Sequence, residues 1–118
     1  MFRVIVAGGR DFSDYQLMKS TLEHLLSNKQ HDEILVVCGG ARGADSLGKK
    51  YALEKGYTIQ HFLPDWEAFG KIAGFKRNVE MAENADALVA FWDGESHGTK
   101  HMIETAINHG LQVRVKRY

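Results

Sequence analysis

The sequence contains almost no cysteine and almost no proline, with one of each in 118 residues. A single thiol, Cys38, excludes an intrachain disulfide and a zinc site built from several cysteines. Because Cys38 lies within an apolar run, we expect it to be a small buried hydrophobic residue and not a nucleophile. A chain of this length can bury a core without crosslinks, so we predict a single domain spanning residues 1–118.

The sequence also lacks a net charge, since 15 Lys and Arg residues balance 15 Asp and Glu residues. Binding to the nucleic-acid backbone needs a basic surplus or a basic stripe, so this balance disfavours a nucleic-acid-binding module. Arg114, Lys116 and Arg117 form a small basic cluster, which we expect on the solvent face of an edge strand. No apolar run is long enough to span a bilayer and no charged leader precedes one, so we expect a cytoplasmic protein.

Two phosphate-binding motifs are missing as well. No segment has the pattern G-x-x-x-x-G-K-S/T of a P-loop. The dinucleotide fingerprint G-x-G-x-x-G is incomplete, because Cys38 occupies the position of its first glycine, ahead of Gly40 and Gly43. These absences disfavour an ordinary kinase, GTPase or NAD-dependent dehydrogenase.

What the sequence does contain is a regular alternation of short apolar runs and amphipathic segments. Strands are expected at five runs, residues 2–7, 34–38, 57–62, 87–92 and 111–115. Helices are expected at residues 14–28, from 44 to about 56, at 73–84, and before Gly110. Ser13 or Asp14 could cap the first helix. Residues 63–71, which include the proline, are expected to form an irregular loop.

This alternation predicts a three-layer, Rossmann-like α/β domain. Parallel strands need crossovers of helix length, and right-handed crossovers place helices on both faces of the sheet. We therefore expect a five-stranded, mainly parallel sheet covered by four helices. Open α/β sheets bind ligands beyond the carboxyl ends of their strands.

Glycine-rich loops follow three of the expected strands at that edge. They are GGRD after the first strand, GGARGAD after the second and DGESHGT after the fourth. Glycine lets backbone N–H groups approach a phosphate, and a following helix N-terminus favours its negative charge. Arg10 and Arg42 add bidentate donors, and Thr99 could cap its helix or donate its hydroxyl. Each loop alone could be a simple tight turn, but three at one edge favour an anionic ligand.

Four carboxylates lie near the expected mouth of the cleft: Asp11, Asp45, Asp93 and Glu95. They could bind ribose hydroxyls, hold Mg²⁺ or act as a general base, and they could equally cap helices. His97 and His101 have the i,i+4 spacing of a metal-binding pair, but we place His97 in the loop before the helix and find no third ligand. We therefore predict no metal site and no cofactor beyond possible Mg²⁺.

Four segments of the sequence are informative in combination: GGRDFSDY, GGARGADSL, PDWEAFGKIAGFKRN and AFWDGESHGT. Together they resemble the YspA-like (cpYpsA-related) branch of the SLOG superfamily, and the resemblance covers nearly the whole chain. It implies a Rossmann-like fold, a cleft for a nucleotide or nucleotide-derived small molecule, and a homo-oligomer of at least two chains. The superfamily includes LONELY GUY phosphoribohydrolases, the DNA-processing protein of natural transformation and nucleotide sensors of bacterial defence systems, which suggests a prophage or defence setting.

The resemblance also assigns site residues by position. From the sequence alone, Arg77 and Asn78 could face the cleft or form a solvated first turn, whereas the family has an Arg-Asn pair here. With Arg42 included, the expected ligand-binding set is Gly8, Gly9, Arg10, Asp11, Gly39, Gly40, Arg42, Gly43, Asp45, Arg77, Asn78, Asp93, Gly94, Ser96, Gly98 and Thr99.

One departure from the superfamily bears on catalysis. The phosphoribohydrolases have P-G-G-x-G-T-x-x-E, in which the glutamate takes part in cleaving the N-glycosidic bond. Met102 occupies that position here, and Glu104 would point elsewhere on the helix.

The leading hypothesis is therefore a nucleotide binder that acts as a sensor or sequestering protein. Trp66 and Trp92 are candidates for stacking on the base, although an aromatic residue beside a strand is more often part of the core. The alternative is an enzyme resembling nucleoside 5′-monophosphate phosphoribohydrolases, with another carboxylate as general base: Asp45, Asp93 or Glu95.

Overall fold

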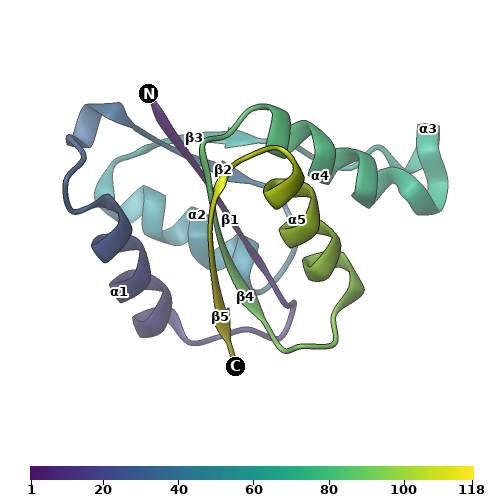
Figure 1. Cartoon of the computed structure of the whole chain (residues 1–118), viewed down its shortest axis with the longest axis horizontal. Helices are drawn as coiled ribbons and strands as arrows, with labels where there is room; N and C mark the ends of the chain where they lie inside the picture. Colours follow the sequence, from purple (N-terminus) through teal and green to yellow (C-terminus); the bar gives the residue numbers. More distant parts are fainter.

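Five parallel strands form one sheet in the order β3-β2-β1-β4-β5 (Figure 1). The structure is a computed structural model that describes residues 1–118. Its strands are β1 (Phe2–Gly8), β2 (Ile34–Cys38), β3 (Thr58–His61), β4 (Ala87–Trp92) and β5 (Gln112–Arg117). The order reverses between β1 and β4, as in doubly wound folds. The predicted Rossmann-like α/β fold is confirmed, with a fully parallel sheet.

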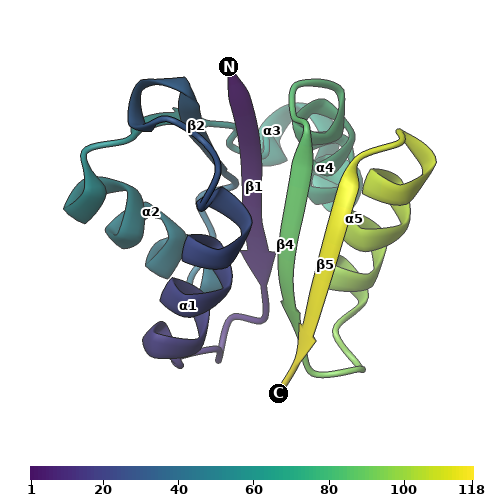
Figure 2. The same cartoon turned by 60° about the vertical axis from the view of Figure 1, so that its left-hand side comes forward.

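Four long helices cover the two faces of the sheet, as Figure 2 shows. They are α1 (Tyr15–Leu26), α2 (Ala44–Lys55), α4 (Ala73–Glu83) and α5 (His97–Asn108). Helices α1 and α2 pack on one face, and α4 and α5 pack on the other. Asp14, and not Ser13, caps α1 by accepting a hydrogen bond from the backbone N–H of Leu17 at 3.0 Å. None of the helices combines the length and apolar character needed to cross a bilayer.

The segment predicted to be an irregular loop is partly helical, which corrects that prediction. The short helix α3 (Trp66–Phe69) and a 3₁₀ turn (Gly70–Ile72) lead into α4. Asp65 caps α3 by accepting from the N–H of Ala68 at 3.0 Å, so one polar side chain starts the turn. Figure 1 shows α3 beyond the outer end of α4, away from the sheet. A second correction concerns His97, which begins α5 and does not belong to the preceding loop.

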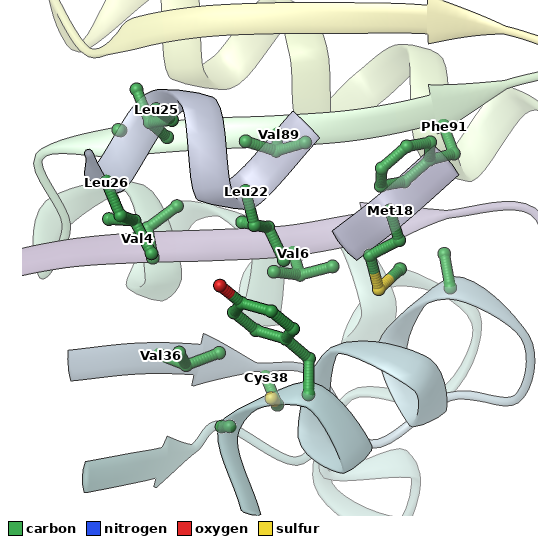
Figure 3. Close-up of a cluster of buried hydrophobic side chains, with 14 of the residues drawn as sticks. Val4, Val6, Met18, Leu22, Leu25, Leu26, Val36, Cys38, Val89 and Phe91 are labelled. Atoms are coloured by element: carbon green, nitrogen blue, oxygen red, sulfur yellow. The ribbon is translucent and has the colours of Figure 1, made fainter. Parts of the chain in front are cut away.

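Alternate residues of the central strands point to opposite faces of the sheet and belong to two separate hydrophobic cores. Val4 and Val6 of β1 pack with α1 and α2, whereas Ile5 and Ala7 pack with α4 and α5. Figure 3 shows the first core, with the side chains of α1 directed at the sheet. Cys38 lies in this core and burial raises the pKa of its thiol to about 12, so it is a protonated hydrophobic residue, as predicted.

Candidate functional site

A cavity of about 950 Å³ opens beyond the carboxyl ends of the central strands. The loops that follow β1, β2 and β4 line it, together with the chain from β3 into α4 and the first turn of α5. Two of these loops follow β1 and β4, the neighbours between which the strand order reverses. Open α/β sheets bind their ligands at such a point.

The cavity brings together most of the residues assigned to ligand binding from the sequence. Those that line it are Gly8, Gly9, Arg10, Asp11, Gly39, Gly40, Arg42, Asp45, Arg77, Asn78, Asp93, Ser96, Gly98 and Thr99. The structure does not place Gly43 or Gly94 in its lining. Nor does the lining include Glu95, one of the carboxylates considered as a general base.

Gly43 holds two of the lining loops against each other. It precedes α2 with a φ of 72°, a conformation that favours glycine. The N–H of Ala44 donates to the carbonyl of Gly9 at 3.2 Å, and a Cβ on Gly43 would collide with that same carbonyl oxygen. The glycine at this position therefore allows the loop after β1 to lie directly on the start of α2.

The side chains of Asp45 and Arg77 both lie against Gly39 in the lining of the cavity. Arg77 donates from Nη1 to the carbonyl oxygen of Gly39 and from Nε to Asn78 Oδ1 at 3.0 Å. Asp45 is only 5% exposed, and its Oδ2 accepts from the N–H of Ala41 at 3.4 Å. A Cβ on Gly39 would lie 2.6 Å from Arg77 Nη1 and 2.8 Å from Asp45 Oδ2, so any larger residue would displace this pair.

Burial shifts the pKa values of both Asp45 and Arg77. It raises the pKa of Asp45, against the opposing effect of Arg77 and the N–H groups of Ala41 and Gly39. Burial also lowers the pKa of Arg77, and the charge on Arg10 lowers it further while Asp45 raises it. A guanidinium remains protonated despite such a shift, so Arg77 keeps a fixed positive charge beside the cavity.

The polar side chains of the loop after β4 mainly make hydrogen bonds within that loop and with the start of α5. Asp93 Oδ1 accepts from the N–H groups of Glu95 at 2.9 Å and Ser96 at 2.8 Å, and these hydrogen bonds lower the pKa of Asp93. Ser96 caps α5, because its Oγ accepts from the N–H of Thr99 at 3.4 Å and lies 3.2 Å from the Thr99 hydroxyl. Gly98 faces open space, since a Cβ there would meet no atom within 4 Å.

Asn78 connects the two helices on this side of the cavity. Its Nδ2 donates to the carbonyl of Gly98 at 3.4 Å and lies 3.1 Å from His101 Nδ1. Burial lowers the pKa of His101, so the ring is neutral at neutral pH and can accept this hydrogen bond. No group of three or more His, Cys, Asp or Glu side chains is placed to hold a metal ion.

Sequence reasoning missed the contribution of residues 63–75 to the cavity. Leu63, Pro64, Lys71, Gly74 and Phe75 line it, and so does Trp66, which was a candidate for base stacking. The other candidate, Trp92, lies outside the lining. The signal in the sequence was a large apolar residue at every third position from Leu63 to Phe75, within a segment otherwise rich in polar and small residues.

The comparisons with known proteins agree with this architecture. The sequence profile of the family described as "YspA, cpYpsA-related SLOG family" matches residues 2–69. The Gene 61 protein of Mycobacterium phage D29 is 36% identical over 122 residues, which cover 96% of this chain and 94% of the phage protein.

Two solved structures share the fold. DNA processing protein A (DprA) of Streptococcus pneumoniae superposes with a TM-score of 0.76 at 17% identity, over 97% of this chain and 49% of the DprA chain. This chain therefore spans about half the length of DprA. TM1055, a structural genomics target, superposes with a TM-score of 0.69 at 26% identity, over 96% of this chain and 72% of its own. The chain belongs to the YspA, cpYpsA-related SLOG family.

Proposed function

We propose that the cavity binds a nucleotide or a nucleotide-derived small molecule, and that the protein acts as its sensor or sequestering protein. This proposal depends on positively charged side chains that line the cavity and have no ion-pair partner. Arg10, Arg42 and Lys71 line the cavity and are exposed. None of them takes part in the ion pairs of the structure, which join Arg3 to Asp86, Lys55 to Glu23 and Lys100 to Glu104.

Three carboxylates line the cavity against four cationic side chains, so they offset this charge only in part. Asp11 accepts a hydrogen bond from the Tyr118 hydroxyl, and Asp93 accepts two from its own loop. Asp45 is buried and accepts from the N–H of Ala41. These donors hold the carboxylates in place without neutralising them, so it is the excess of one positive charge in the lining that favours an anion in the cavity.

The glycine loops supply the phosphate subsite in this proposal. No side chain caps α2, and Gly39 and Gly40 precede it without side chains that would block an approaching phosphate. Gly98 and Thr99 form the corresponding surface at the start of α5. Arg77 would neutralise the phosphate from a position fixed by its hydrogen bonds to Gly39 and Asn78. Asp11 and Asp45, which also line the cavity, would accept hydrogen bonds from the ribose hydroxyls in this proposal.

A second candidate function, cleavage of the N-glycosidic bond, would depend on Asp45. Among the three carboxylates considered as general base, only Asp45 both lines the cavity and has a raised pKa. The pKa of Asp93 is lowered, and Glu95 lies outside the lining. Met102, at the position of the family glutamate, is 1% exposed in the apolar core and supplies no proton-transfer group.

The test is a thermal-shift screen with AMP, GMP, CMP, UMP, ATP and NAD, followed by chromatography of the incubated nucleotides. A ligand present at about 100 times its Kd should stabilise the protein by about 2.7 kcal/mol and be recovered unchanged. Because arginines supply the charge, we expect the same shift in EDTA as with added Mg²⁺. Sedimentation velocity on the same samples tests the expected homo-oligomer.

Two variants link the shift to this cavity. Arg77→Ala removes the fixed charge, and Gly98→Val directs a side chain into open space, so both should lose the shift and remain folded. Lys50→Ala, an exposed change outside the lining, should keep it. Full binding by both cavity variants would show that the ligand binds elsewhere, and no shift with any nucleotide would refute the proposal. Release of free base by the wild type, abolished in Asp45→Asn, would identify a hydrolase.

A further inference from the structure

Residues 63–75 expose an unusual amount of apolar surface. They contribute five of the ten large hydrophobic side chains that the fold leaves exposed: Leu63 at 68%, Trp66 at 55%, Phe69 at 44%, Ile72 at 53% and Phe75 at 45%. Isolated exposed hydrophobic residues are common, but a cluster of them marks a binding surface. This cluster borders the cavity, because Leu63, Trp66 and Phe75 are part of its lining.

Trp66 lies close to the cationic part of the cavity. Its Cη2 is 3.6 Å from where a Cβ on Gly74 would be, so the indole lies against the first turn of α4. Gly74 precedes Arg77 by three residues, and residues at this spacing share a helix face about 4.5 Å apart along the axis. An apolar surface and a fixed positive charge are therefore adjacent, as a ligand with a flat base and a phosphate would require.

The ring of Trp66 is free to stack, whereas the other candidate rings are occupied. Phe75 packs against His101 with 4.3 Å between ring centroids. Trp92 is covered by the Arg117 guanidinium at 5.3 Å, and its Nε1 donates to the carbonyl of Ser96 at 3.1 Å. Trp66 has no aromatic or cationic partner in the structure and no hydrogen bond to its Nε1.

We propose that Trp66 stacks on the base of the bound nucleotide and is the main determinant by which the cavity selects a base-bearing ligand over a sugar phosphate. This inference rests on the proposed function and narrows it to ligands with an aromatic base. Stacking on an aromatic side chain needs only a π-face, so Trp66 supplies affinity for any base and little discrimination among bases.

Calorimetric titration of variants with AMP, GMP and ribose 5-phosphate tests the assignment. Trp66→Ala should weaken binding of AMP and GMP at least about fivefold, the lower end for loss of one stacked base. Binding of ribose 5-phosphate, which has no base to stack, should change less than about twofold. Trp66→Phe keeps a ring and should recover most of the lost affinity. Phe69→Ala removes a comparably exposed ring on the same segment but outside the cavity lining, and should bind as the wild type does.

Fluorescence provides a second readout, because the chain has only two tryptophans. In Trp92→Phe, Trp66 is the only tryptophan, and with excitation selective for tryptophan AMP should quench its emission while ribose 5-phosphate should not. In Trp66→Phe, the emission of the half-buried Trp92, which lies outside the cavity lining, should not respond to AMP.

The outcomes separate this inference from the proposed function. If the wild type binds AMP or GMP and Trp66→Ala binds them equally well, the base subsite is wrong and the proposed function stands. An equal loss of ribose 5-phosphate binding would likewise overturn the stacking role. If Trp66→Ala and Phe69→Ala both dissociate an oligomer, the apolar cluster is an interface between copies of the chain and the inference fails. Absence of binding by any nucleotide in the wild type would refute the proposed function itself.

Discussion

Among single residues, Asp45 shows most clearly how the fold constrains the charges at the cavity. It is 5% exposed, next to a fixed guanidinium and beneath a loop that has no room for a side chain at Gly39. The pKa of Asp45 remains raised, so burial disfavours its charged form more than Arg77 and the loop N–H groups favour it. A buried carboxyl with a raised pKa in the lining of a cavity is typical of a functional site.

The raised pKa of Asp45 predicts a particular pH dependence. A carboxyl that holds its proton more tightly in the folded chain lowers the free energy of unfolding as the pH rises above its ordinary pKa of 3.8. Below that pH the group is protonated in both states and makes no difference. Asp45→Asn removes the ionisation, so the Tm of the variant minus that of the wild type should be more positive near pH 7 than near pH 4.

Thermal melts of both proteins across this range provide the measurement. Asp14→Asn is a suitable control, because Asp14 is an exposed helix cap for which asparagine is an equally good replacement. A Tm difference for Asp45→Asn that is constant with pH, or more negative near pH 7, would show that the carboxylate is better stabilised than its burial indicates.

At the scale of elements, the sequence predicts the long helices and strands well and the short helix α3 poorly. Strand β2 and strand β4 have the predicted bounds, because buried parallel strands are continuous apolar runs between clear breaks. Helix α3 has only four residues and no buried face, so it leaves no periodic pattern in the sequence. Its start depends on the cap at Asp65, a signal that also occurs in simple turns.

Helix α2 approaches the sheet closely because of Gly48. A Cβ at this position would lie 2.7 Å from the Cβ of Val6, which is fully buried in the central strand β1 and cannot move aside. We expect Gly48→Ala to destabilise the protein by about 1–3 kcal/mol, despite the better helix propensity of alanine. Urea unfolding monitored by circular dichroism provides the measurement.

Gly98 offers the matched control, since it is also a helical glycine but faces open space. Gly98→Ala should be neutral or stabilising by up to about 1 kcal/mol. Equal effects at the two positions would mean that helix propensity, and not the distance between α2 and β1, decides the cost.

At the scale of the whole molecule, the strand order concentrates stability in the middle of the sheet. Strands β1 and β4 are paired on both sides and covered on both faces, whereas β3 and β5 are edge strands with exposed residues. We expect amide hydrogens of β1 and β4 to exchange only through global unfolding, and those of β3 to exchange at least about tenfold faster. Exchange followed by mass spectrometry measures this gradient. Uniform protection across the sheet would indicate that β3 unfolds only together with the core.

Sequence alone determined the type and order of the main elements and the edge at which the glycine loops gather. It did so because burial on both faces, helical periodicity and glycine at strand ends are local patterns. The resemblance added Arg77 and Asn78 to the expected site. Tertiary structure placed these residues, with most of the others assigned, around one cavity.

Only the tertiary structure decided which side chains are accessible to a ligand and which are engaged by other parts of the chain. Asp93 lines the cavity, but its Oδ1 accepts hydrogen bonds from its own loop, and Gly94 lies outside the lining, where it makes room for the Arg117 guanidinium. Trp66 and Trp92 are equal candidates in the sequence, and only Trp66 lines the cavity with a free ring. The physical reason is that hydrogen bonds and packing between distant segments occupy some side chains and leave others open, and no local pattern records that choice.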